Sequence, residues 1–221
     1  MIFLYQKAHI FMMAVAVANL KKLKQVLLVF VKNAVKGKVK TRLAATLGDD
    51  VAFEIYHRLL LHTELSTNPV SSHKIVFYSD FIDTNDIWNN EVYQKRVQNG
   101  KDLGKRMANA FEYAFTNGNE KVAIIGSDCF EITTEIIEAA FKQLDHMDVV
   151  IGPALDGGYY LLAIKSNNKA LFQHIQWSTD QVLSQTMEVC HQMGLKVAQL
   201  QVLSDIDNEN DLKRLGYNYQ I

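Results

Sequence analysis

The stretch QVLLVFVKNAVKGKVKTRLAATLG, residues 25–48, joins an unbroken apolar run to a cationic loop. Continuous apolar runs of this length, rich in valine and leucine, are typical of strands that are buried on both faces. The charged residues begin at Lys32, directly after the run. We therefore expect a buried strand over residues 25–31 that leaves the sheet as a basic loop.

Short apolar runs alternate with amphipathic segments along the rest of the chain. This alternation is typical of a single α/β domain with a mainly parallel sheet flanked by helices. Ser178 followed by Gln181 predicts a capping box at the start of the helix before Cys190. The other strand candidates are 74–79, 92–98, 121–127, 148–153, 159–165 and 196–203, and the helix candidates are 49–65, 103–115, 133–144 and 180–193.

The composition favours one globular domain without a polyanionic partner. The chain has 221 residues, 48% of them hydrophobic, and a formal net charge of -1, so we expect neither a nucleic acid nor a membrane as partner. Cys129 and Cys190 are too few for a disulfide scaffold, which fits a reducing cytoplasm.

The apolar segment Ile10–Leu20 is too short to span a bilayer. We interpret residues 1–24 as a helical extension and 25–221 as the domain; the oligomeric state is not indicated.

The basic loop differs from a Walker phosphate-binding loop. That motif needs a glycine where this chain has Ala34 and another where it has Val39, so a P-loop is disfavoured. A solvated basic loop is one alternative. The other is a loop that turns at Gly37 and wraps a polyphosphate with its lysine and arginine side chains.

Charged residues follow several of the predicted strands where each one ends. Ligands of open parallel sheets collect at this edge, beyond the carboxyl ends of the strands. Asp128 follows the strand candidate 121–127, where a carboxylate could hold Mg²⁺ or serve as a helix N-cap. The residues expected to converge on the edge are Lys32 to Arg42, Ser127, Asp128, Asp156, Gly157, Gly158, Asp205 and Asp207.

Six blocks along the chain also resemble one known family. They are FVKNAVKGKVKTRLAATLG, VQNGKDLGKRMANAF, VAIIGSDCFEIT, DVVIGPALDGGYYLLAI, FQHIQWSTDQVL and LSDIDNENDLKRL, in this order. Together they are similar to the bacterial nucleotide-diphospho-sugar transferase-like proteins found beside radical-SAM/selenodomain proteins, some of which are called arsenosugar biosynthesis glycosyltransferases. The 2-phospho-lactate and molybdenum-cofactor guanylyltransferases are similar at greater distance. The resemblance implies a GT-A-like fold with a nucleotide over the exit loop of the first strand.

The resemblance also implies roles for individual residues. Mg²⁺ or Mn²⁺ would be held by Asp128 and Asp207, with Asp205 as a competitor for the second place. The remaining roles follow from the residue types: Lys40 and Arg42 are expected to act in catalysis by neutralising charge on a departing phosphate, and Asp156, beside two glycines, as a possible general base. The nucleotide-binding set is Lys32, Gly37, Lys40, Thr41, Arg42, Gln98, Gly100 and Arg106, and the acceptor-binding set is Asp156, Gly157, Gly158 and Trp177.

Three functions stay open at this point. The first is glycosyl transfer from a nucleotide sugar to a small acceptor, and the second is nucleotidyl transfer from a nucleoside triphosphate with release of pyrophosphate. The third is a nucleotide-binding protein without catalysis. Its only support is that Asn33 and Phe130 stand where the family usually has proline, which could loosen both loops.

Overall fold

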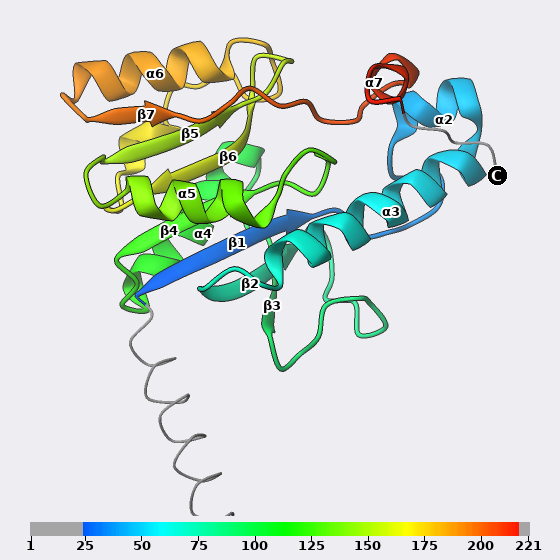
Figure 1. Cartoon of the computed structure of the whole chain (residues 1–221), viewed down its shortest axis with the longest axis horizontal. Coiled ribbons are helices and arrows are strands. Elements are labelled where there is room, and N and C mark those ends of the chain that lie inside the picture. Colours follow the sequence, from blue (N-terminus) through cyan, green and yellow to red (C-terminus); the bar gives the residue numbers. More distant parts are fainter. Residues whose placement is uncertain (1–23, 217–221) are drawn as a thin grey trace, which may run out of the picture.

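The computed structural model describes residues 24–216, which contain one seven-stranded sheet (Figure 1). The extension predicted over residues 1–24 lies outside the described residues, apart from Lys24. The strand order is β3-β2-β1-β4-β6-β5-β7, and each neighbouring pair is parallel except the two that include β6. The predicted mainly parallel α/β fold is thus confirmed. The strands are β1 (Gln25–Val31), β2 (His73–Tyr78), β3 (Tyr93–Val97), β4 (Lys121–Ile125), β5 (Val149–Pro153), β6 (Tyr159–Ile164) and β7 (Val197–Gln199).

Helices cover both faces of this sheet (Figure 1). Buried residues of α3 and α5 pack on one face, and those of α4 and α6 pack on the other. All four predicted helices are present, whereas the sequence did not predict α2 or the 3-10 helix η1. The helices are α2 (Thr41–Leu47), α3 (Asp49–Thr67), α4 (Leu103–Thr116), α5 (Thr134–Gln143), η1 (Lys169–Phe172), α6 (Val182–Gln192) and α7 (Glu209–Arg214).

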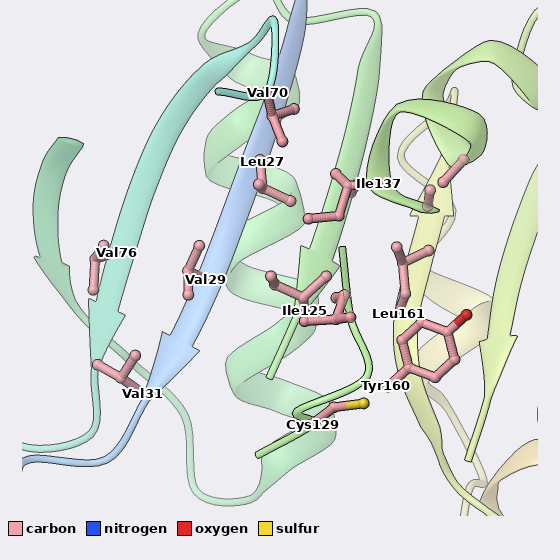
Figure 2. Packing of buried hydrophobic residues seen from close by; sticks show 14 of the residues in the cluster. Leu27, Val29, Val31, Val70, Val76, Ile125, Cys129, Ile137, Tyr160 and Leu161 are labelled. Atoms are coloured by element: carbon pink, nitrogen blue, oxygen red, sulfur yellow. The ribbon is translucent and has the colours of Figure 1, made fainter. Parts of the chain in front are cut away.

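Strand β1 lies inside the sheet, between β2 and β4, and this position explains its apolar sequence. Leu27, Val29 and Val31 pack into the core on the α3 and α5 side, as Figure 2 shows. Val26 and Leu28 point to the opposite core, on the α4 and α6 side. Because both faces are covered, every position of the strand interior needs an apolar side chain.

Strand β7 is shorter than predicted, and the reason lies in its neighbour. The predicted strand covered residues 196–203, but regular pairing ends at Gln199. Pro153 of β5 has no N–H group to donate to β7, and the register of β5 against its other neighbour, β6, shifts between Gly152 and Pro153. Pairing resumes only as an isolated bridge between Ala154 and Leu203. The segment after β7 therefore follows the sheet loosely and can turn over its carboxyl edge.

The predicted capping box at Ser178 is wrong. Ser178 has a positive φ of 64°, and helix α6 is preceded by Gln181 without a side-chain cap. Instead, the amide of Leu183 in the first turn donates to the carbonyl of Gly157, at 2.9 Å. The β5–β6 hairpin thus supplies the acceptor that a serine side chain was expected to supply. Among residues 24–216, no helix has both the length and the apolarity that a membrane span requires.

Candidate functional site

The site lies at the carboxyl edge of the sheet, where the segment after β7 passes the end of β4. The amide of Leu203 donates to the carbonyl of Pro153 at 3.1 Å, and that of Ile206 donates to the carbonyl of Asp128 at 2.8 Å. These two bonds fix the C-terminal segment on the edge. Asp205 and Asp207, which flank Ile206, are thereby brought to Asp128 as the sequence predicted.

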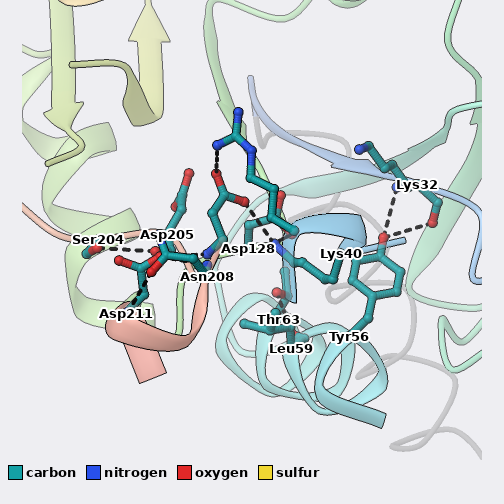
Figure 3. Close-up of polar contacts among 12 residues, drawn as sticks. Lys32, Lys40, Tyr56, Leu59, Thr63, Asp128, Ser204, Asp205, Asn208 and Asp211 are labelled. Carbon is teal, nitrogen blue, oxygen red and sulfur yellow. Dashed lines mark hydrogen bonds and ion pairs between the residues drawn. The ribbon is translucent and has the colours of Figure 1, made fainter. Parts of the chain in front are cut away.

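Lys40 is the cation at the centre of this cluster. Its ammonium lies 2.7 Å from Asp128 Oδ1 and 3.5 Å from Asp207 Oδ1, and its side chain is 5% exposed (Figure 3). Lys40 precedes α2 and adopts a left-handed backbone with φ of 48°, which is uncommon for a residue with a Cβ. The strained backbone and the buried ion pairs occur at the same residue. We infer that this backbone conformation serves to place the lysine side chain beside the two carboxylates.

Arg42 stands at the outer side of the same cluster. Its guanidinium Nη1 is 3.6 Å from Asp207 Oδ2, but the side chain is 78% exposed. An exposed ion pair of this kind contributes little to stability. Its charge is therefore available to an anionic ligand at the sheet edge.

Asp205 completes an acidic group around Lys40. Burial, and after it the charge of Asp128, raises the pKa of Asp205 to about 7 against the opposing charge of Lys40. The charges of Asp156 and Asp207 act in the same direction as that of Asp128. Asp205 thus lies close enough to three other carboxylates to be influenced by their charges, an arrangement that a bound cation would relieve.

Lys32 is fixed by a residue that the sequence analysis did not single out. The hydroxyl of Tyr56, in α3, accepts from the amide of Lys32 at 2.9 Å and donates to its carbonyl at 2.8 Å (Figure 3). Burial and the nearby charge of Asp128 raise the pKa of Tyr56, so this hydroxyl stays protonated. The sequence feature that could have indicated this contact was a polar tyrosine hydroxyl within the apolar stripe of the helix.

The remainder of the basic loop turns between these two lysines. Gly37 has a positive φ of 77°, as predicted for a turn, and Thr41 is the first residue of α2. Lys36 forms an exposed ion pair with Asp50 at the start of α3. The loop is therefore held at both ends, with Lys32 and Arg42 on its flanks.

Asn33 and Phe130, which stand where the family usually has proline, each make side-chain contacts that hold their loops. The buried amide of Asn33 accepts from the amide of Asp80 at 3.0 Å and donates to the carbonyl of Phe81 at 2.8 Å. Phe130 packs edge-on against His62 of α3, with ring centroids 5.7 Å apart. Each side chain thus makes a contact that anchors its own loop.

Gln98, Gly100 and Arg106 form a second cluster at the sheet edge. Gln98 Nε2 donates to the carbonyls of Val31 and Phe77, at 3.2 and 3.0 Å. Arg106 Nε donates to the carbonyl of Gly100 at 3.1 Å, and a Cβ on Gly100 would lie 2.6 Å from the Arg106 amide. Arg106 Nη1 also donates to Gln98 Oε1 at 3.4 Å, so these contacts join the start of α4 to the ends of β1 and β2, and the role of the three residues in nucleotide binding stays a prediction.

The residues predicted to bind the acceptor separate into two places. Asp156 accepts from the amide of Gly158 at 2.9 Å, in the hairpin beside the acidic group, while Gly157 packs on the backbone of Asp180 at a positive φ of 87°. Trp177 instead lies flat against Gly104 and lines a cavity of about 290 Å³ between α4 and η1. Asp156, Gly157 and Gly158 are not among the residues that line this cavity.

Comparison with known proteins fixes the family. The family described as "Uncharacterized protein conserved in bacteria (DUF2064)" matches residues 63–179. The chain belongs to the DUF2064 family. Among curated proteins, no sequence matches the chain. A DUF2064 assignment alone states no activity, so the solved structures are more informative about the site.

The chain is similar to the crystal structure of a candidate nucleotide-diphospho-sugar transferase from Desulfovibrio desulfuricans G20. The two share 32% identity with a TM-score of 0.82, over 87% of this chain and 86% of that one. The T. maritima inositol-1-phosphate CTP transferase is similar at 14% identity and a TM-score of 0.57, over 89% and 94% of the chains. A CMP:2-keto-3-deoxy-manno-octonic acid synthetase complexed with CTP is similar at 8% identity and a TM-score of 0.52, over 86% of this chain and 96% of that one. The last two show a shared fold only.

A divalent cation fits the cluster in one particular way. Within residues 24–216, no group of three or more histidine, cysteine or carboxylate side chains could hold a metal ion. Mg²⁺, however, is commonly bound through one or two carboxylates, with substrate phosphates supplying further oxygen ligands. Asp128 and Asp207 share Lys40 and offer two such carboxylates. The cluster therefore fits a cation that arrives with a phosphate ligand.

Proposed function

We propose that this DUF2064 protein is a metal-dependent nucleotide-diphospho-sugar transferase that moves a glycosyl group from a nucleotide sugar to a small acceptor. The observation that supports it best is the pairing of Lys40 with Asp128 and Asp207, at 2.7 and 3.5 Å, on the carboxyl edge of the sheet. This edge is where open α/β sheets bind their ligands. The similarity to the Desulfovibrio desulfuricans protein supports the same class of donor.

The residues around Lys40 suit a donor with a diphosphate. Arg42 is exposed beside Asp207, and Lys32 lies at the exit of β1, so two cations flank the place of the phosphates. Mg²⁺ or Mn²⁺ held by Asp128 and Asp207 would neutralise charge that develops on the departing diphosphate. Lys40 keeps both carboxylates in position before the ligand arrives.

Asp156 is the candidate general base toward the acceptor. Its carboxylate lies in the β5–β6 hairpin, exposed to solvent and close enough to Asp205 to affect that residue. A base must reach the hydroxyl that it deprotonates, and an exposed hairpin beside the cluster permits this. In this scheme the acceptor hydroxyl passes its proton to Asp156 while it attacks the sugar.

Nucleotidyl transfer is the second candidate. It is favoured by the single aspartate of the GSDC segment, in contrast to an Asp-x-Asp pair, and by the fold shared with CTP-dependent enzymes. The same cations would then assist departure of pyrophosphate from a nucleoside triphosphate. The third hypothesis, a non-catalytic protein, loses its support because Asn33 and Phe130 anchor their loops.

One experiment tests the site and separates the two reactions. Thermal unfolding is measured with nucleotide sugars and nucleoside triphosphates, each with and without Mg²⁺ or Mn²⁺, for the parent, Asp128→Asn and the control Asp145→Asn. Asp145 is an exposed carboxylate at the opposite edge, paired with Lys121. We expect metal-dependent stabilisation by the donor in the parent and the control, and its loss in Asp128→Asn.

The products identify the reaction. A nucleoside diphosphate released from a nucleotide sugar supports glycosyl transfer, whereas pyrophosphate released from a triphosphate supports the second candidate. Donor binding that needs no metal and is unchanged in Asp128→Asn would refute the metal site.

A further inference from the structure

Asn33 joins two loops that are far apart in sequence. Its Oδ1 accepts from Ser79 Oγ at 3.2 Å and from the amides of Asp80 and Phe81, at 3.0 and 3.3 Å. Its Nδ2 donates to the carbonyl of Phe81 at 2.8 Å. The backbone N–H of Asn33 also donates to Ser79 Oγ at 3.1 Å. Both sides of the side-chain amide are used, so the loop after β1 is fixed against the loop after β2.

The Asn33 side chain at the centre of this network is buried, which makes the geometry of its hydrogen bonds specific. Asn33 is 5% exposed. A buried amide that both donates and accepts hydrogen bonds favours one arrangement, because any other arrangement leaves polar groups unpaired away from water. A proline at this position would have no side-chain donor or acceptor to offer. The loop containing Ser79, Asp80 and Phe81 is thus placed by this chain's own asparagine.

The network holds an aromatic ring in solvent beside the cationic loop. Phe81 is 51% exposed, although Asn33 binds both its N–H and its C=O group. Ile82, the next residue, is also exposed. Contiguous exposed apolar side chains commonly mark a binding surface. Here the backbone that presents the ring is bonded to the residue that follows Lys32.

We propose that Phe81 is the surface on which the nucleobase of the donor stacks, and that Asn33 is the positioning residue that holds it there. This inference rests on the proposed function, since it assumes a nucleotide at the sheet edge. A nucleoside diphosphate has its base and its phosphates joined through one ribose, so an aromatic ring and cations must lie next to each other. Asn33, the residue that follows Lys32, bonds to the backbone of Phe81 and so holds the two loops together, and every base has a face that can stack on phenylalanine.

Isothermal titration calorimetry with a matched pair of ligands tests the proposal. ADP, GDP, CDP and UDP each carry a base, whereas inorganic pyrophosphate offers only the phosphates; all are titrated with Mg²⁺. The variants are Phe81→Ala, Phe81→Trp and Asn33→Ala. Leu65→Ala is the control, because Leu65 is also apolar and exposed, at 62% against 51% for Phe81, but lies in the last turns of α3.

Phe81→Ala should weaken binding of the preferred nucleoside diphosphate about tenfold, the size expected for loss of one base-stacking contact. Pyrophosphate binding should be unchanged in this variant. Phe81→Trp should retain nucleotide affinity, and Leu65→Ala should behave as the parent. Asn33→Ala should weaken the nucleotide more than pyrophosphate, a difference that a general loss of structure would not produce.

Two results would overturn the inference while leaving the proposed function intact. One is nucleotide affinity that does not change in Phe81→Ala, which would assign the exposed ring to another partner. The other is an equal loss of nucleotide and pyrophosphate affinity in that variant. If the parent binds neither ligand, the proposed function itself fails, and this inference fails with it.

Discussion

Replacing Lys40 with methionine should destabilise the protein and make it depend on divalent cations. The lysine side chain is 5% exposed, and its ammonium lies 2.7 Å from Asp128 and 3.5 Å from Asp207. With an effective dielectric constant of about 20, the shorter contact alone corresponds to roughly 6 kcal/mol of Coulomb attraction. Desolvation of the ammonium offsets much of this attraction.

The net loss can be bounded from measured behaviour of buried pairs. Removing one partner of a fully buried pair costs about 3–5 kcal/mol. Asp128 and Asp207 retain 39% and 42% of their side-chain exposure, so water screens the charges that are left behind. We therefore expect a loss of about 2 kcal/mol in the free energy of unfolding, or a fall of about 4–8 °C in Tm for a domain of this size.

The assay is thermal unfolding by circular dichroism, in EDTA and then with MgCl₂. Without lysine, the carboxylates repel one another, so Mg²⁺ should raise the Tm of Lys40→Met more than that of the parent. Lys36→Met is the matched control, because Lys36 lies in the same loop but pairs with Asp50 in solvent. A Lys40→Met protein that melts like Lys36→Met in EDTA would refute the reasoning.

Two further substitutions test other parts of the structure. Gly157→Ala would place a Cβ against the backbone of Asp180 at a positive φ, and it should cost about 2 kcal/mol or more in urea unfolding; Gly118→Ala, with a similar φ but open space, should cost only about 1 kcal/mol. Burial lowers the pKa of Lys74, so between this lowered pKa and 10.5 the unfolded chain binds more protons and stability rises with pH. Lys74→Met should lack this rise. A variant whose stability in urea depends on pH in the same way as that of the parent would contradict the assignment of the rise to Lys74.

The sequence predicted the sheet well because its strands are buried on both faces. Apolar runs such as residues 25–31 and 121–125 leave little choice of structure, and the charged residues after them had to meet at one edge. The error at β7 came from Pro153, a residue of the neighbouring strand. The apolar pattern of one strand does not show where its pairing with the neighbouring strand is interrupted.

The finer features of the site depend on contacts between distant loops. Asn33 bonds to residues 79–81, and Tyr56 of α3 bonds to the backbone of Lys32 at the exit of β1. Nothing in the local pattern around either residue shows these pairings. For the same reason the sequence could place Lys40 on a basic loop but not inside a buried cluster. Trp177 was grouped with Asp156, Gly157 and Gly158, but it lines a cavity that these three residues do not line, and its role in acceptor binding stays a prediction.

The order in which the charges of the site leave the ribosome has a consequence for synthesis. Lys40 is made first and Asp128 next, while Asp207 follows only after β7. A nascent chain halted before Ser204 would hold most of the sheet yet lack half of the carboxylates around Lys40. Translation thus completes most of the sheet before the acidic group around Lys40 has all of its members.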